Sequence, residues 1–352
     1  MGKWEECVRK VTPYTPGEQP KQRDIIKLNT NENPYPPAPS VKAAIEEFDA
    51  DSLRLYPDPE CGELIDALSA HFGMRPECFF VGVGSDDVIA MAFQTFFNSG
   101  RPILFPDISY SFYSVWASLF GIPYRTPALD GDLSIVKEDY FTENGGIIFP
   151  NPNAPTGIYM ELEDVEEIVK KNPSSVVIVD EAYVDFAGPS AMRFVDKYDN
   201  LLVVQTFSKS RSLAGLRVGF AVGSPKLISY LNDVKFSFNS YTLGRPTLKA
   251  AAASLSDDDY FRETVLKIKL TRERTKEGLK QLGFDFPDSG SNFIFARHRT
   301  RSGRELFEAL KAAGIYVRHF DAPRIDDYLR ITVGTDGEMD ALLDFLQKYL
   351  QG

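Results

Sequence analysis

The chain has 352 residues, of which 43% are apolar and 25% are charged, and its formal net charge at pH 7 is −11. These values are typical of a folded protein of about two domains and exclude a disordered, collagenous or coiled-coil chain. The negative charge also disfavours nucleic acids and anionic lipids as partners.

The N-terminal residues contain no apolar run followed by a cleavage site of small residues, and no stretch approaches the ~18 apolar residues of a membrane span. The cysteines, Cys7, Cys61 and Cys78, are widely spaced and form no CxxC pair. The sequence therefore predicts neither a disulfide framework nor a metal site. We expect a cytoplasmic protein that binds neither nucleic acid nor membrane.

Residues 1–40 are predicted to form an arm that packs against another part of the protein. Turn and helix-breaking residues follow one another at 12–17 (TPYTPG) and 33–37 (NPYPP), with little periodicity between them.

From Phe79 onward, short apolar runs alternate with amphipathic segments. The runs are rich in β-branched and aromatic residues and are bounded by Gly, Pro or Asn, which is typical of βα units with a buried, mostly parallel sheet. The predicted strands lie at 79–83, 102–106, 146–150, 174–180, 201–207 and 218–223, with helices at 85–97 and 162–171 between them.

The pattern changes after about Ser240. A long, charged, amphipathic helix is expected at 257–283, followed by strands and helices of a smaller α+β unit. These later elements are predicted at 291–298, 303–314, 315–320, 328–334 and 339–351. The fold class is therefore α/β, a helix-flanked central sheet with a smaller α+β domain.

The segment after the strand at 201–207 is the most informative. Lys209 lies between hydroxyl residues, and Arg217 follows eight positions later. A lone lysine after a strand is usually solvated, but these groups together suit an anion at the carboxyl edge of the sheet.

Asp180 ends another apolar strand, and Tyr183 follows it. A carboxylate at a buried strand end requires a partner or caps the next helix, and the sequence leaves both readings open. Glycine-containing turns at 82–87 and 151–157 could present backbone N–H groups to a phosphate. Neither turn has the Rossmann or P-loop pattern, and each could simply start a helix.

Taken together, a lysine, a carboxylate, a tyrosine, an arginine and a phosphate-type turn match the needs of pyridoxal 5′-phosphate. The arrangement resembles the fold-type-I aminotransferases over nearly the whole chain. More narrowly, the segments LNTNENPYPP, RLYPDP, VDEAYVDF, TFSKSRSLAGLRVG and YLRITVGT resemble the histidinol-phosphate aminotransferases.

The resemblance implies roles for residues that would hold the cofactor. Lys209 would bind it as a Schiff base and move protons, Asp180 would pair with the pyridine nitrogen, and Tyr183 would hydrogen-bond the ring oxygen O3′. The phosphate would be held by the turn at Ser85 and Asp86 together with Ser208 and Arg217.

Three further positions follow from the same resemblance. Tyr56 would reach the phosphate of a partner subunit, which implies a homodimer with a shared active site, and Tyr110 would stack on the cofactor ring. Most relatives have Asn before the Pro-Thr-Gly, where this chain has Ala154. Asn153 is expected to replace it, although Asn151, or Tyr183 alone, are alternatives.

The substrate side is implied in the same way. Arg330 and Arg318 would bind the carboxylate or phosphate of the substrates, since a guanidinium fork suits both anions. Tyr14 and Asn33 would complete the pocket.

The expected reaction is transamination between L-histidinol phosphate and 2-oxoglutarate. L-threonine-phosphate decarboxylase and aromatic amino-acid aminotransferase are alternatives on the same scaffold, and a cofactor-binding module without catalysis is a fourth. The expected organisation is an arm at 1–27, a part of the small domain at 28–48, a large cofactor-binding domain at 49–245 and a small C-terminal domain at 246–352.

Overall fold

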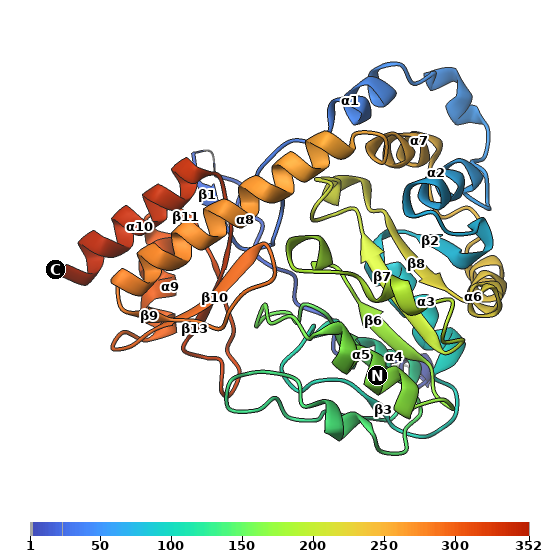
Figure 1. The fold of residues 1–352 in the computed structure, drawn as a ribbon, viewed down its shortest axis with the longest axis horizontal. Helices are drawn as coiled ribbons and strands as arrows, with labels where there is room; N and C mark the ends of the chain where they lie inside the picture. Colours follow the sequence, from blue (N-terminus) through green and yellow to red (C-terminus); the bar gives the residue numbers. More distant parts are fainter. Residues whose placement is uncertain (1–2, 23, 352) are drawn as a thin grey trace.

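The computed structural model describes residues 3–22 and 24–351, and their elements gather around a large and a small β-sheet (Figure 1). Within these ranges no helix combines the length and the apolar character needed to cross a membrane.

The large sheet has seven strands in the order β2-β8-β7-β6-β5-β3-β4. Strands β3 to β7 are mutually parallel, whereas β8 runs antiparallel to both of its neighbours, β2 and β7. The strands are β2 Phe79–Gly82, β3 Ile103–Leu104, β4 Tyr124–Arg125, β5 Ile147–Pro150, β6 Val177–Asp180, β7 Leu201–Thr206 and β8 Gly219–Gly223.

Both faces of this sheet are covered by helices, which explains why its strands read as unbroken apolar runs. Val177 and Val179 point into a core shared with helices α2 and α5, whereas Ile178 points into a second core shared with α3, α4 and α6. The helices are α2 Gly62–Phe72, α3 Gly84–Phe96, α4 Phe112–Phe120, α5 Leu162–Lys171 and α6 Pro225–Phe238.

The small unit is built on an antiparallel sheet in the order β12-β13-β10-β9, beside the parallel pair β1-β11. Its elements are β1 Ile26–Lys27, α8 Asp258–Gln281, β9 Phe284–Asp285, β10 Phe293–His298, α9 Gly303–Ala312, β11 Ile315–Tyr316, β12 Arg318–His319, β13 Tyr328–Thr332 and α10 Asp336–Gln351. The predicted fold class, a mostly parallel sheet with a smaller α+β unit, is confirmed.

The early chain contacts both units. Strand β1 pairs with β11 of the small unit, whereas helix α1 (Pro39–Glu46) packs on α7 (Arg245–Ser254), and residues of both helices belong to a core of the large sheet. The domain boundaries at 27, 48 and 245 stay a prediction.

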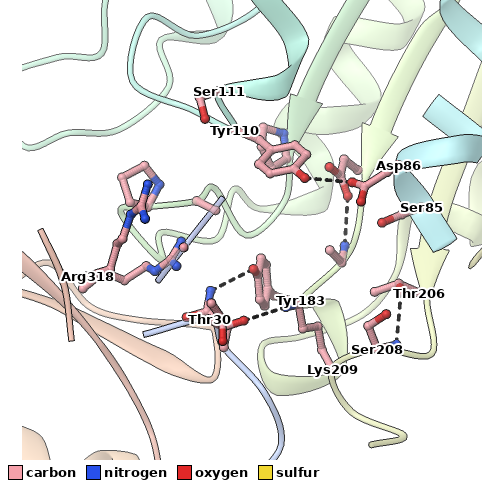
Figure 2. Close-up of a pocket in the computed structure, with 18 of the residues that line it drawn as sticks. Thr30, Ser85, Asp86, Tyr110, Ser111, Tyr183, Thr206, Ser208, Lys209 and Arg318 are labelled. Atoms are coloured by element: carbon pink, nitrogen blue, oxygen red, sulfur yellow. Dashed lines mark hydrogen bonds between the residues drawn. The ribbon is translucent and has the colours of Figure 1, made fainter. Parts of the chain in front are cut away.

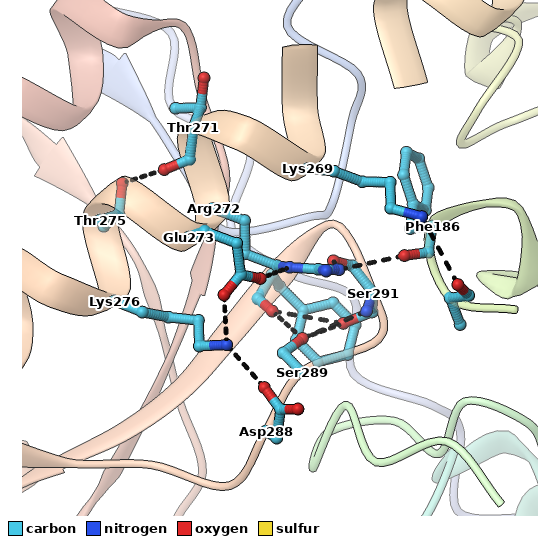
Figure 3. A network of polar contacts seen from close by, with 12 residues as sticks. Phe186, Lys269, Thr271, Arg272, Glu273, Thr275, Lys276, Asp288, Ser289 and Ser291 are labelled. Atoms are coloured by element: carbon cyan, nitrogen blue, oxygen red, sulfur yellow. Dashed lines mark hydrogen bonds and ion pairs between the residues drawn. The ribbon is translucent and has the colours of Figure 1, made fainter. Parts of the chain in front are cut away.

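Arg272, on helix α8, connects the two units (Figure 3). One of its terminal nitrogens donates to the carbonyl of Phe186, which follows β6, at 3.2 Å and to the carbonyl of Ser291, just before β10, at 2.8 Å. Nearby, the Gly290 N–H donates to the Gly157 carbonyl at 2.7 Å. Backbone groups of both units are therefore bonded together on one side of the site described next.

Candidate active site

A cavity of about 230 Å³ lies where β5, β6 and β7 end, between the large sheet and the small sheet (Figure 2). Carboxyl ends of parallel strands meet at one edge of a sheet, and α/β folds bind their ligands there. Most of the site residues predicted from the sequence line this cavity. They are Tyr14, Ser85, Asp86, Tyr110, Asp180, Tyr183, Ser208, Lys209, Arg217, Arg318 and Arg330.

Lys209 follows strand β7, and its amine points into the cavity. The Nζ donates to the carbonyl of Thr30 at 3.1 Å and lies 5.8 Å from the ring centre of Tyr183. The backbone of this loop is held from behind, because Asn33 Nδ2 donates to the carbonyls of Lys209 and Ser210, each at 3.1 Å. The loop therefore holds the amine within the cavity, next to Tyr183.

Asp180 is the last residue of β6 and is only 5% exposed. Its Oδ2 accepts from the Tyr113 hydroxyl at 2.7 Å, and its Oδ1 accepts from the Ala182 N–H at 3.2 Å. Burial raises the pKa of the Asp180 carboxyl to about 6, despite these bonds and the charge of Lys209. A cationic N–H partner in the cavity would therefore be bound strongly by this carboxylate.

An anion-binding corner forms where helix α3 begins. Its first-turn N–H groups, at Ser85 and Asp86, have no carbonyl partner within the helix, and the helix dipole adds positive potential. Ser208 Oγ and Arg217 contribute from the other side, with the Arg217 guanidinium 3.5 Å from Ser208 Oγ and 3.1 Å from Asp86 Oδ2. The arrangement suits a phosphate.

Gly219 sets how closely β8 approaches this corner. A Cβ at position 219 would lie 2.3 Å from Ser85 N, which no real contact allows. We expect Gly219→Ala to displace the first turn of α3 and to weaken the binding of pyridoxal phosphate about tenfold or more, as its phosphate loses charge-assisted hydrogen bonds. Titration of the cofactor into the cofactor-free protein, followed by fluorescence, measures this.

Gly215 provides the matched control for this prediction. It lies between Lys209 and Arg217, and a Cβ there would meet no heavy atom within 4 Å. Gly215→Ala should therefore leave cofactor affinity unchanged. Equal affinities for the two alanine variants would contradict the role given to Gly219.

Two arginines lie at the small-sheet side of the cavity. Arg318 on β12 and Arg330 on β13 are direct cross-strand partners, and their guanidiniums lie 5.7 and 5.5 Å from the same ring, that of Phe320. Arg330 donates to the Asn29 carbonyl at 3.0 Å, yet its buried Nε has no partner in the described part of the chain. Burial lowers the pKa of Arg330, so an anion placed here would stabilise its charge.

The arm reaches the cavity through Tyr14. Its ring stacks on Phe112 at 4.3 Å and lies 6.5 Å from the ring of Tyr110, whose hydroxyl donates to Asp86 Oδ1 at 2.7 Å. The predicted packing of the arm against another element is therefore confirmed around Tyr14.

Three predicted residues do not line the cavity. Asn153 Nδ2 donates to the Ile108 carbonyl at 3.0 Å and to Thr156 at 3.1 Å, which corrects the expectation that it turns toward the cavity. Asn33 does not line the cavity, and its side chain donates instead to the backbone carbonyl of Lys209. Tyr56 is 76% exposed, outside the cavity, and stacks on Tyr241.

The structure also adds residues that sequence reasoning missed. Thr30 and Asn31 belong to the segment LNTNENPYPP, in which the sequence analysis gave a role to Asn33 alone. Tyr113 lies in the first turn of α4, whereas Tyr110 precedes that helix, so no helical spacing in the sequence linked the two tyrosines.

The residues present fit pyridoxal phosphate. An amine, a buried carboxylate that lacks a cationic hydrogen-bond partner among the described residues, a phosphate-type helix start and two arginines line one cavity. These are the groups needed for the aldehyde, the pyridine nitrogen and the phosphate of the cofactor, and for the anionic end of a substrate.

Comparisons with known proteins agree with this site. The family profile described as aminotransferase class I and II matches residues 23–346. A histidinol-phosphate aminotransferase from Chromohalobacter salexigens is 51% identical over 98% of this chain and 98% of its own.

Solved structures give the same fold. A histidinol-phosphate aminotransferase from Sinorhizobium meliloti, in complex with pyridoxal-5′-phosphate, superposes with a TM-score of 0.85 at 25% identity, over 94% of this chain and 92% of that one. An L-threonine-O-3-phosphate decarboxylase from Porphyromonas gingivalis superposes with a TM-score of 0.79 at 20% identity, over 93% of this chain and 100% of that one, and shows the common fold alone.

Proposed function

Because this chain belongs to the class I and II aminotransferases, and within them to the family of the histidinol-phosphate aminotransferases, we propose that it transfers an amino group between L-histidinol phosphate and 2-oxoglutarate. The products are imidazole-acetol phosphate and L-glutamate, in a step of histidine biosynthesis. The observation that carries the proposal is a single cavity that holds an amine, a buried carboxylate and two guanidiniums, namely Lys209, Asp180, Arg318 and Arg330.

Pyridoxal phosphate, when bound, supplies an electron sink for the pair of electrons left on the substrate Cα when its proton departs. Lys209 would hold the cofactor through its amine, and the first turn of α3, Ser208 and Arg217 would hold its phosphate. Asp180 would accept the N–H of the pyridine nitrogen, with its own carboxylate fixed by the bond from Tyr113.

Lys209 would then move protons. With its amine free, Lys209 Nζ would act as a base and would take the proton from the Cα of L-glutamate. In the other half of the reaction, it delivers a proton to the corresponding carbon of imidazole-acetol phosphate. The loop holds the amine in the cavity throughout, because Asn33 bonds the carbonyls of Lys209 and Ser210.

Arg318 and Arg330 would bind the anionic ends of both substrates in turn. L-Glutamate presents carboxylates and L-histidinol phosphate presents a phosphate, and a guanidinium fork accepts either. Their cross-strand positions place the two cations side by side. The clamp therefore suits both substrates without rearrangement of the sheet.

The proposal includes a homodimer in which Tyr56 contacts the phosphate in the partner subunit. Two observations support the dimer. Tyr56 is exposed and lies outside the cavity of its own subunit, and Arg245 fixes the Tyr56 backbone by donating to its carbonyl at 2.9 Å. The cytoplasmic location expected from the sequence is also part of the proposal and rests on the biosynthetic reaction.

We expect two impaired variants to complement each other when mixed as subunits. Tyr56→Ala should weaken cofactor binding, and Lys209→Ala should remove the reacting amine. A heterodimer of the two has one site with both residues intact, so co-expression should restore turnover at limiting cofactor. Activity that never exceeds that of the Tyr56→Ala dimer alone would contradict a shared site.

A substrate panel tests the reaction itself. L-Histidinol phosphate, L-threonine phosphate and L-phenylalanine are each supplied with 2-oxoglutarate, while L-glutamate and carbon dioxide are measured. We expect glutamate from histidinol phosphate at the highest kcat/KM and no carbon dioxide. Carbon dioxide from threonine phosphate without glutamate, or a preference for phenylalanine, would overturn the proposal in favour of the corresponding alternative.

A further inference from the structure

Asn31 is a buried residue whose side chain contacts the active-site tyrosine. It is 1% exposed and has φ at 57°, a left-handed conformation that asparagine adopts more readily than most residues. Its Nδ2 lies 2.9 Å from the Tyr183 hydroxyl, and its carbonyl accepts from Asn292 Nδ2 at 3.0 Å. Asn31 is thus fixed both in its backbone and at its side chain.

Thr332 decides which way the Asn31 amide faces. The backbone N–H of Asn31 can only donate, and it donates to Thr332 Oγ1 at 3.0 Å. The single proton of that hydroxyl is then free for Asn31 Oδ1, which lies 3.0 Å away. With Oδ1 accepting from Thr332, the NH₂ group of Asn31 must face Tyr183.

The direction of this bond determines where the Tyr183 proton points. Because the Tyr183 oxygen accepts from Asn31, its own proton cannot be given to Asn31. In the described part of the chain, this is the one hydrogen bond that the Tyr183 hydroxyl makes. The hydroxyl therefore keeps its proton for an acceptor in the cavity, which Tyr183 lines (Figure 2).

We propose that Asn31 is a positioning residue that turns the Tyr183 hydroxyl proton toward the cavity, so that Tyr183 donates to the ring oxygen O3′ of pyridoxal phosphate. The proposal rests on the proposed function, because it needs the cofactor. It also agrees with Ala154, which has no donor side chain. Since the amide of Asn153 donates to Ile108 and Thr156 and that of Asn151 donates to Met160, Tyr183 remains as the donor to this oxygen.

The charged and titratable groups around Tyr183 come from several elements and are common to all variants described below. Lys209 lies 5.8 Å from the ring, and Arg330 on β13 and Tyr113 on α4 interact with it electrostatically. The ring packs edge-on against Phe293 on β10 at 5.1 Å. A spectral difference among the variants therefore reports on the hydroxyl proton and not on a change of neighbours.

The test is the pH at which the visible absorbance of the Lys209-bound cofactor changes as that chromophore loses its proton. The positive end of an O–H aimed at O3′ stabilises the deprotonated form and lowers this midpoint. We expect Asn31→Ala to raise the midpoint by about one pH unit, the free energy of one ordinary hydrogen bond, and Tyr183→Phe to raise it at least as much. In the double variant, the midpoint should equal that of Tyr183→Phe alone.

Controls separate this role from a structural one. Asn292→Ala removes an equally buried amide that bonds only the backbone of Asn31, so it should lower thermal stability but, since Thr332 still orients the Asn31 amide, shift the midpoint much less than Asn31→Ala does. If Asn31→Ala does not fold, Asn31→Asp takes its place, because a carboxylate would accept the Tyr183 proton. The added charge can itself shift the midpoint, and the Tyr183→Phe background measures that effect alone. The shift should therefore be larger when Tyr183 is present than when it is absent.

The outcomes are distinguishable. The role of Asn31 is overturned if Asn31→Ala leaves the midpoint unchanged. It is also overturned if Asn31→Ala shifts the midpoint of Tyr183→Phe as much as it shifts that of the wild type. If the wild-type protein forms no pH-dependent visible chromophore with pyridoxal phosphate, the proposed function itself fails, whatever Asn31 does.

Discussion

Replacing Lys209 with alanine is expected to lower kcat for transamination by about 10⁴-fold or more. In the proposed reaction, one side chain would supply both the amine that binds the cofactor and the base that moves the substrate proton, and Lys209 is the one lysine among the residues that line the cavity. Steady-state formation of glutamate from histidinol phosphate measures the loss. Borohydride treatment followed by mass spectrometry of the peptide that contains residue 209 measures the covalent attachment.

Small amines give this prediction a second readout. If the variant lacks only a base, then added methylamine should restore part of the turnover while covalent attachment stays absent. Lys226, an exposed lysine on α6, provides the control, because Lys226→Ala should behave as the wild type. Retention of most of the turnover in Lys209→Ala would refute the central assignment.

The second large effect is expected at Asp180. Asp180→Asn keeps the shape of the side chain and an oxygen for the Tyr113 hydroxyl, but removes the charge that would hold a proton on the pyridine nitrogen. We expect kcat to fall about 10²–10⁴-fold, with cofactor still attached to Lys209 and with a much smaller change in KM. A variant with wild-type kcat would show that Asp180 does not face the pyridine nitrogen.

The same residue gives a pH dependence. The pKa of the Asp180 carboxyl, raised to about 6 by burial, should fall when a cationic N–H of the cofactor binds beside it. Below about pH 6, the cofactor must then displace a proton from Asp180, so its affinity should decrease as the pH falls, and this contribution should be constant above that pH. Cofactor affinity measured from below to above pH 6 should show this decrease in the wild type. In Asp180→Asn, the part of the decrease that comes from protonation of Asp180 should be absent.

The strands of the large sheet other than the exposed edge strand β4 could be predicted because they are buried on both faces. Apolar runs such as 177–179 and 201–204 have no polar face to confuse with a helix, so their positions follow from composition alone. The reversed direction of β8 could not be predicted, because the residues of 219–223 are equally apolar in either direction.

Candidate site residues that directly follow a strand could be predicted. Residues that reach the cavity from a distant part of the sequence could not. Lys209 and Asp180 stand directly after apolar runs, so the sheet itself places them. Thr30 and Asn31 contact Lys209 and Tyr183 across 179 and 152 positions, and no local pattern encodes such a pairing. Asn153 was assigned to the cavity because its residue type is suitable, whereas the geometry of its turn directs the amide to Ile108.

The bridge made by Arg272 has a consequence for how this enzyme tolerates change. Its guanidinium bonds the carbonyls of residues 186 and 291, and a carbonyl is the same in every amino acid. Substitutions at either position can therefore alter side chains without deleting the acceptors that hold Arg330 of the small unit opposite Lys209 of the large one. The link between the two units thus depends on backbone atoms, whereas the side chains of Phe186 and Ser291, both fully buried, are constrained by their packing instead.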